Sequence, residues 1–346
     1  MELELDCDFY FGDIDDGLLK KVDFSVFDKH ISLLKTVKLF SNFNWIRGAF
    51  KLTFCKRYKT YILTGDPFCL SNWLILIANK ILGKKTYLWT HGWYGDETRI
   101  KQLLKKIFFG LSTGLFLYGD YAKDLMIQNG FRKEKLHVIY NSLNYDSQIV
   151  VRNKLRQNFV YQDYFGNDYP VVIFTGRLTS IKKIDQLIET HHILLKQGVF
   201  FNVFLLGDGP EFAYLKNLVD KNGNSSYFWF YGACYDEAEI GNFYYNASVC
   251  VSPGNVGLTA IHAMTYGCPV ITHNNFPQQM PEFEVIQENI TGTFFEKDNV
   301  NSLAEVLKKW ITIVKDKASI ERDCFNVIDS KYNPNHQIKV FKEFLR

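Results

Sequence analysis

The 346-residue sequence contains no apolar run near the roughly 20 residues that a membrane-spanning helix requires. Its beginning also lacks the basic, then apolar, then small-residue order of a secretory leader. We therefore expect a cytoplasmic protein. The Asn-x-Ser/Thr triplets at Asn224, Asn246 and Asn289 are then expected to stay unmodified, because glycosylation at such sites needs a secreted chain.

Two further scarcities exclude whole classes of site. The seven cysteines are scattered and include no Cys-x-x-Cys pair, which argues against a disulfide framework and against a zinc site. An excess of either charge is also missing, since 40 Lys and Arg against 37 Asp and Glu leave a net charge of +3. This balance excludes nucleic-acid binding driven by overall charge, so any basic site must be local.

What the sequence does contain is a doubled strand and helix rhythm. Such a rhythm predicts parallel sheets and an α/β fold, and the length favours two domains. The first series predicts strands at 60–64, 86–90, 114–118 and 136–140, with helices at 72–82, 99–111 and 121–129. The second predicts strands at 171–175, 201–206, 227–231, 249–252 and 269–272, with helices at 184–197, 211–221, 237–246 and 302–314.

Domain boundaries follow from where this rhythm fails. The polar stretch 144–169 is interpreted as a linker, which gives a first domain at 1–150 and a second at 151–330. A last helix at 335–345, within the segment 331–346, is a candidate for packing back on the first domain. The first 50 residues show only a short strand and turn at 9–12 and a helix start at 15–22.

A glycine-rich turn between an apolar run and a helix-like pattern is a candidate anion site. The run ends at Pro253-Gly254, and Asn255, Val256 and Gly257 precede a helix pattern that begins near Leu258. The first N–H groups of a helix have no internal partner, and glycine lets a phosphate approach the backbone. Gly257, Leu258 and Thr259 would then meet the phosphate, although the glycines could equally serve only to shape a tight turn.

A second turn carries two cations toward the same sheet edge. Gly176-Arg177-Leu178 follows the strand at 171–175, and Lys182 closes the turn. Because the carboxyl ends of parallel strands share one edge, Arg177 and Lys182 would neutralise a diphosphate held at the glycine-rich turn. A solvated charged turn is the alternative. The later Gly207-Asp208-Gly209 lacks the full Gly-x-Gly-x-x-Gly pattern, so dehydrogenase chemistry gains no support.

The first series adds one candidate site and one candidate surface. His91 and Gly92 follow the strand at 86–90, at the carboxyl end where open parallel sheets bind ligands. The helix 99–111 is basic and amphipathic, with Lys101, Lys105 and Lys106 among its cations. Two interpretations stay open for this helix: packing on the sheet, and contact with an anionic membrane surface.

Taken together, these motifs resemble a known family. Gly-Arg-Leu-x-x-x-Lys, Gly-Asp-Gly-Pro-Glu and the run from Gly257 to Ile271 are similar to retaining glycosyltransferases of the "glycosyl transferases group 1" family. The likeness is strong over residues 171 to about 307, and weaker signatures occur at 89–92 and 139–141. The resemblance implies a GT-B fold, with two Rossmann-like doubly wound domains facing across a cleft.

The resemblance also implies an activity and roles for residues. The protein would transfer a sugar, with retention of configuration, from a nucleoside-diphosphate donor such as a UDP-sugar to a glycan or lipid-linked acceptor in polysaccharide assembly. No metal ion, cofactor or nucleic acid would take part. The protein would act in the cytoplasm, in possible association with the inner face of the membrane. The implied catalytic residues are His91, Arg177 and Lys182, and the implied donor-binding residues are Gly92, Gly176, Cys234, Asn255, Val256, Gly257, Leu258, Thr259, His262 and Glu284.

The sequence departs from the family pattern at one place. The family carries two Glu residues in a Glu-x7-Glu motif, and here those positions hold Gly254 and His262. His262 can still accept a hydrogen bond from the ribose, and Glu282 or Glu284 could face the sugar, with Glu284 preferred. Two rival functions stay open: a nucleotide-sugar epimerase or hydrolase that uses His91, Glu282 and Glu284, and a non-catalytic binding subunit.

Overall fold

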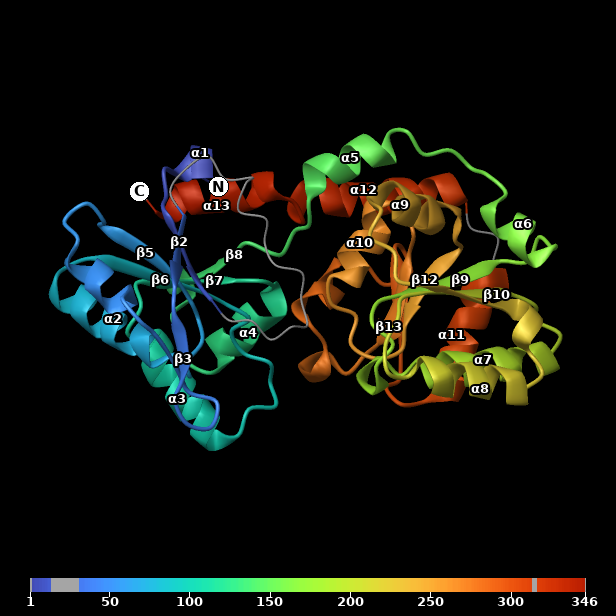
Figure 1. The fold of residues 1–346 in the computed structure, drawn as a ribbon, viewed down its shortest axis with the longest axis horizontal. Helices are drawn as coiled ribbons and strands as arrows, with labels where there is room; N and C mark the ends of the chain where they lie inside the picture. Colours follow the sequence, from blue (N-terminus) through green and yellow to red (C-terminus); the bar gives the residue numbers. More distant parts are fainter. Residues whose placement is uncertain (1, 14–30, 313–315, 346) are drawn as a thin grey trace. The chain divides into compact units, whose positions relative to one another are not determined.

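The computed structural model describes residues 2–13, 31–312 and 316–345. Its chain forms two compact units (Figure 1). Unit 1 comprises Met1–Tyr140 together with Pro334–Arg346, and unit 2 comprises Asn141–Asn333. The boundaries therefore lie at 140/141 and 333/334, whereas the sequence pattern places them at 150/151 and 330/331. The helix start expected at 15–22 lies outside the described residues.

Unit 1 is built on a parallel sheet in the order β5-β6-β7-β8. Three helices connect these strands and lie on one face of the sheet, which follows from right-handed crossovers between neighbouring strands. The strands are β5 (Thr60–Thr64), β6 (Lys85–Thr90), β7 (Gly114–Leu117) and β8 (Leu136–Val138), and the helices are α2 (Leu70–Ile81), α3 (Arg99–Gly110) and α4 (Asp120–Gln128).

Side chains alternate between the two faces of this sheet. Leu88 packs in a cluster with α2, α3 and α4, whereas the neighbouring Tyr87 packs with Phe341 in another cluster. Phe341 belongs to α13 (Pro334–Phe344), which covers the second face beside α1 (Glu2–Leu5). The Tyr87 hydroxyl donates to the Phe344 carbonyl at 2.6 Å, so the C-terminal helix is tied to this sheet.

Short strands precede the main sheet of unit 1. β1 (Phe9–Gly12) pairs in parallel with β2 (Ile31–Leu34). β3 (Thr36–Lys38) pairs antiparallel with β4 (Asn44–Ile46), and the 3-10 segment η2 (Ala49–Phe54) leads into β5. Only the first of these strands was expected from the sequence. Within the described residues, no helix combines the length and apolar content needed to cross a membrane.

Unit 2 is built on six parallel strands in the order β11-β10-β9-β12-β13-β14. The chain moves outward from β9 to β11, then returns to place β12 on the other side of β9. The strand order reverses there, and open α/β sheets bind ligands at the carboxyl ends of the strands at such a point. The strands are β9 (Val171–Thr175), β10 (Asn202–Leu206), β11 (Phe228–Gly232), β12 (Val249–Ser252), β13 (Val270–His273) and β14 (Gly292–Phe295).

Helices cover both faces of this sheet (Figure 1). One face packs on α7 (Ile184–Lys196), α8 (Phe212–Lys221) and α11 (Val300–Thr312) through a large aliphatic and aromatic core. The other face packs on α9 (Glu237–Asn246), α10 (Thr259–Thr265) and α12 (Lys317–Lys331). Parallel sheets and helices on two faces confirm the predicted α/β fold class.

The linker prediction for 144–169 is wrong in detail. This stretch carries α5 (Tyr145–Arg152) and α6 (Val160–Phe165), and both belong to unit 2. Arg152 of α5 forms an ion pair with Asp329 at 2.8 Å, and the buried Tyr161 of α6 donates to the Phe243 carbonyl at 2.8 Å. Helices this short are stabilised by a few tertiary contacts. Their sequences therefore do not show the repeating apolar pattern by which longer helices are predicted.

Candidate functional site

Two loops meet at the carboxyl ends of β9 and β12, where the strand order of unit 2 reverses. The loop after β9 runs from Gly176 to Lys183 and includes the 3-10 turn η4 (Ser180–Lys182). The loop after β12 runs from Pro253 to Leu258. The Gly254 N–H donates to the Lys182 carbonyl at 3.0 Å, which joins the two loops through their backbones. The structure therefore brings together the two turns that the sequence placed at one edge.

Lys182 is held in place by the glycine-rich turn. Its Nζ donates to the Asn255 carbonyl at 2.8 Å and to Asn255 Oδ1 at 2.9 Å. Burial lowers the pKa of Lys182, and the carboxylate of Glu282 opposes that shift. An ammonium carries three N–H donors, so two bonds to Asn255 leave one for a ligand. Lys182 is thus a partly desolvated, oriented cation.

Gly254 has no room for a side chain. A Cβ built on this residue would lie 2.1 Å from the Ile181 carbonyl oxygen and 2.8 Å from the Lys182 Cα. Both atoms belong to backbone, so neither can swing away as a flexible side chain would. The absence of an acid at this position therefore has a packing cause: the loop after β9 occupies the space where a side chain would begin.

Arg177 and the glycine-rich turn that ends at Gly257 belong to the same two loops. Arg177 is exposed, and the preceding Gly176 N–H donates to the Leu206 carbonyl at 3.0 Å. Gly257 has φ +52°, the left-handed backbone that glycine adopts without strain. The buried Val256 N–H is used by Gln279 Oε1 at 2.9 Å. The first bonds of the turn that opens α10 are Ala260 N–H to Gly257 O and His262 N–H to Leu258 O.

The anion-site prediction needs adjustment, because α10 is short. Thr259–Thr265 is only seven residues long, so few peptide dipoles align to attract an anion at its N-terminus. A phosphate would depend on the individual N–H groups of Gly257, Leu258 and Thr259, together with the cations of the neighbouring loop. Thr259 is also anchored to the other loop, since its hydroxyl donates to the Thr175 carbonyl at 3.4 Å.

His262 lies one turn further along α10 and has a carboxylate partner. Its Nε2 is 2.8 Å from Glu237 Oε1, at the beginning of α9. The Tyr266 hydroxyl donates to the same oxygen at 2.6 Å, and Gln148 Nε2 donates to it at 2.9 Å. Burial raises the pKa of Glu237, but the hydrogen bonds and charge of His262, with the other two donors, outweigh it and hold that pKa at about 2. Sequence reasoning missed Glu237, since nothing in the chain links it to position 262.

Of the two acids Glu282 and Glu284, Glu282 is the better placed to act on Lys182. Its side chain is 3% exposed, and its Oε1 accepts from Asn141 Nδ2 at 2.7 Å. Its Oε2 is buried and has no hydrogen-bond partner among the residues that the structure describes, and its charge raises the pKa of Lys182 against the effect of burial. Glu284, preferred from the sequence, belongs to the same 3-10 segment η7 (Pro281–Val285) but is not among its buried residues. The structure therefore favours Glu282 over Glu284 as a neighbour of Lys182.

Cys234 follows β11, two strands away from the switch point. Its thiol donates to Glu239 Oε2 at 3.1 Å, and Glu239 also accepts from the Tyr231 hydroxyl. Burial raises the pKa of the Cys234 thiol, and the Glu239 carboxylate raises it further. A raised pKa favours the protonated thiol and so disfavours a nucleophilic role, and the neighbouring backbone stays the candidate for reading a base.

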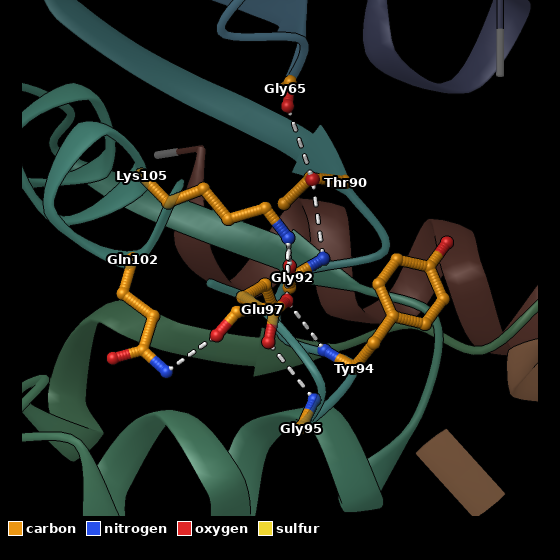
Figure 2. Close-up of polar contacts among 8 residues, drawn as sticks. All are labelled: Gly65, Thr90, Gly92, Tyr94, Gly95, Glu97, Gln102 and Lys105. Atoms are coloured by element: carbon orange, nitrogen blue, oxygen red, sulfur yellow. Dashed lines mark hydrogen bonds and ion pairs between the residues drawn. The ribbon is translucent and has the colours of Figure 1, made fainter. Parts of the chain in front are cut away.

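In unit 1, the loop after β6 begins with His91 and Gly92, and polar contacts link Gly92, Tyr94, Gly95 and Glu97 of this loop to one another or to Lys105 (Figure 2). The Glu97 carboxylate accepts from Tyr94 N–H at 2.8 Å and from Gly95 N–H at 3.0 Å. Lys105 Nζ donates to the Gly92 carbonyl at 2.9 Å and to Glu97 Oε1 at 2.7 Å.

This network fixes the side chains around His91. Burial raises the pKa of Glu97, but Lys105 and the two N–H groups outweigh it, so that pKa lies below its usual value. The His91 ring contacts Tyr94 and Tyr118, with centroids 5.9 and 4.8 Å away. Lys105, one of the cations that a membrane contact of this helix would use, is 17% exposed and points into this loop. Its role is structural support of the His91 loop.

Comparison with known proteins finds a family match within unit 2. Residues 160–322 match the family model "Glycosyl transferases group 1". An "Uncharacterized 41.2 kDa protein in cps region" of Klebsiella pneumoniae is 26% identical over 265 residues, which are 75% of this chain. The match covers 63% of that relative, so the chain spans less than two thirds of its length.

Solved structures show the same fold. The structure of Anabaena Alr3699/HepE in complex with UDP has a TM-score of 0.67 at 18% identity, and covers 86% of this chain and 81% of its own. The lipopolysaccharide outer core galactosyltransferase WaaB, in its apo form, has a TM-score of 0.68 at 15% identity over 97% and 98% of the two chains. The chain has the GT-B type of α/β fold, and its residues 160–322 match the model of the glycosyl transferases group 1 family.

Proposed function

We propose that the protein is a retaining glycosyltransferase that moves a sugar from a nucleoside-diphosphate donor to a hydroxyl group of a glycan or a lipid-linked acceptor. The observation that carries this proposal is the junction of Lys182 and Asn255 at the switch point of a family-matched domain. There an oriented cation, an exposed arginine and a glycine-rich turn converge on the place where a diphosphate would bind.

In the proposed reaction, the bond between the anomeric carbon and the diphosphate oxygen breaks. The acceptor oxygen forms its bond on the same face of the sugar, and its proton passes to the departing phosphate. The protein stabilises the negative charge that develops on the leaving diphosphate, through Arg177, Lys182 and the backbone N–H groups of Gly257–Thr259. These groups supply the charge, so the proposal includes no metal ion and no cofactor.

A thermal-shift panel of nucleotides and nucleotide-sugars tests the donor class. We expect one nucleoside diphosphate and its sugars to raise the melting temperature, because a ligand at 100 times its dissociation constant stabilises a protein by about 2.7 kcal/mol. UDP is the first probe, because the HepE structure contains it. NMR of the product made from that donor then assigns the anomeric configuration. A panel in which no nucleoside diphosphate shifts the melting temperature would refute the proposal.

For the acceptor, we propose a growing surface glycan. The named relatives support this choice: one carries "cps region" in its name, and another is a lipopolysaccharide outer core galactosyltransferase. Such acceptors carry lipid anchors or long sugar chains, so the acceptor side of the enzyme would work at a membrane surface.

Two helices of unit 1 offer a surface for that membrane. α3 buries Phe108 and Phe109, yet Ile100, Leu103 and Ile107 are 83, 61 and 53% exposed. α2 lies beside it, since Trp73 contacts Phe108 with ring centroids 4.9 Å apart. α2 adds its own exposed residues Leu74, Ile77 and Ile81. Exposed Arg99, Lys101 and Lys106 accompany the apolar residues of α3, a combination that suits an anionic lipid surface.

Replacing Leu103 and Ile107 together by serine is expected to lower binding to anionic vesicles at least about tenfold, because each buried aliphatic side chain contributes about 1.5–3 kcal/mol. Co-sedimentation with vesicles of phosphatidylglycerol and phosphatidylcholine measures this. Ile290→Ser in unit 2 removes another exposed aliphatic side chain, and it should leave binding unchanged. Equal sedimentation of wild type and the double variant would argue against this surface.

A further inference from the structure

Four side chains from three helices meet at one carboxylate oxygen in unit 2. Glu237 Oε1, at the first residue of α9, is 2.8 Å from His262 Nε2 of α10. Tyr266 of α10 and Gln148 of α5 donate to the same oxygen at 2.6 and 2.9 Å. This cluster stands where the family motif would place a glutamate, because position 262 itself holds a histidine.

The cluster determines which atoms of the pair can receive a ligand. All three recorded bonds use Oε1, so among the described residues Glu237 Oε2 is the oxygen left for a ligand. The Glu237 side chain is 36% exposed and that of His262 is 21% exposed, so both reach solvent. Because His262 Nε2 faces the Glu237 carboxylate, Nδ1 is the ring nitrogen that can meet a ligand, as an acceptor in the neutral ring and as a donor in the charged ring.

The cluster also lies close to Gly257–Thr259, the candidate phosphate site at the start of α10. His262 follows Thr259 by three residues, which puts both on one face of α10. The Thr259 hydroxyl bonds the Thr175 carbonyl at the end of β9, and the His262 ring is 5.3 Å from that of Tyr244, whose hydroxyl contacts Thr175 Oγ1. A diphosphate at Gly257–Thr259 would therefore place its nucleoside within one helical turn of this pair.

We propose that Glu237 and His262 together bind the ribose diol of the nucleoside diphosphate, with the carboxylate supplied by α9 in place of the one that α10 lacks. Glu237 Oε2 accepts from one ribose hydroxyl and His262 Nδ1 hydrogen-bonds the other, while Gln148 and Tyr266 hold the carboxylate in place. This inference rests on the proposed function, because it needs a nucleoside diphosphate at the switch point. A competing role for the cluster is a purely structural link between α5, α9 and α10.

Isothermal titration with nucleoside diphosphates and their 2′-deoxy forms separates these roles. Of UDP, GDP and ADP, the tightest binder is compared with its own 2′-deoxy form. We expect wild type to bind the ribose form at least about tenfold more tightly, because a hydrogen bond to a charged group contributes that much. Glu237→Gln should bring this ratio close to one and leave the affinity for the 2′-deoxy form unchanged. Glu305→Gln, an exposed acid on α11, is the control and should keep the wild-type ratio.

A rescue variant sharpens the test. His262→Glu alone would place two carboxylates against each other, so ribose selectivity should fall. Combined with Glu237→Gln, it restores one carboxylate at the site, and the ratio should return toward the wild-type value. Tyr266→Phe removes a structural donor without removing a carboxylate, so it should lower the melting temperature and keep the ratio.

Each contrary result has a distinct meaning. If the nucleotide binds but wild type does not distinguish the ribose form, or if Glu237→Gln leaves the ratio unchanged, the ribose role is overturned and the proposed function stands. A double variant no better than Glu237→Gln would equally overturn the ribose role. If none of the three nucleoside diphosphates binds wild type, both the ribose role and the proposed function are overturned.

Discussion

Lys182→Gln is expected to lower kcat/KM for sugar transfer by about 10²-fold or more, because it removes a preorganised charge from the leaving diphosphate. The structure gives the reason for so large an effect from one loop residue. Two hydrogen bonds to Asn255 fix the ammonium group, so little reorganisation is needed when negative charge develops on the phosphate. Arg177→Ala should lower kcat/KM in the same direction.

The matched control is the adjacent residue. Lys183→Gln makes the same charge change on an exposed side chain at the start of α7, and it should keep kcat/KM within about threefold of wild type, since water and salt screen a solvent-exposed charge. Steady-state kinetics with the donor found in the nucleotide panel measures both variants, and circular dichroism confirms that each is folded. If Lys182→Gln and Lys183→Gln transfer sugar equally well, Lys182 does not stabilise the leaving group.

The sequence predicted the second sheet well because its strands are buried on both faces. Such strands form continuous apolar runs, as in Val171–Thr175, and the run itself marks the element. α9 was predicted with its observed ends, since Asp236 caps its first turn by accepting from Glu239 N–H at 2.9 Å. These elements are specified by their local sequence, so the apolar runs and the hydrophobic periodicity were enough to predict them.

Elements held mainly by tertiary contacts were missed. α12 has only three buried residues, Cys324, Val327 and Ile328, in fifteen positions, so its apolar stripe is too thin to recognise. β14 is an edge strand of four residues, too short to stand out from the loops that flank it. In both cases the neighbouring elements supply the stabilisation, and a single sequence does not display them.

The candidate site shows the same division. Lys182 and the turn at 253–257 could each be found, since glycine and lysine at strand ends are recognisable signals. Their direct contact through Asn255 could not, because it joins residues 73 positions apart. The contact of Glu237 with His262 could not be predicted either, since only the packing of α9 against α10 brings the two side chains together. Sequence interpretation therefore found the two turns that meet at the switch point and missed the partner of the histidine.

Gly254 is the position where the structure changes the interpretation most. From the sequence, it was one of two positions where the family motif carries Glu and this chain does not. In the structure, any Cβ there would meet the Ile181 carbonyl oxygen at 2.1 Å, and the Gly254 N–H binds the Lys182 carbonyl. Adding even one methyl group must push the two loops apart, and Lys182 would move away from the diphosphate as they separate.

Gly254→Ala is therefore expected to destabilise unit 2 by at least about 2 kcal/mol, the range found for overpacked sites, and to lower the melting temperature by about 5 °C. Gly254→Glu should be worse, because the same clash is joined by a carboxylate. Gly110→Ala is the matched control, since a Cβ there has no atom within 4 Å, and its melting temperature should stay close to that of wild type. Thermal unfolding followed by circular dichroism measures all three. A Gly254→Glu variant that is as stable as wild type and transfers sugar faster would show that the loops can separate without cost, and that the missing acid, rather than the loop contact, limits this enzyme.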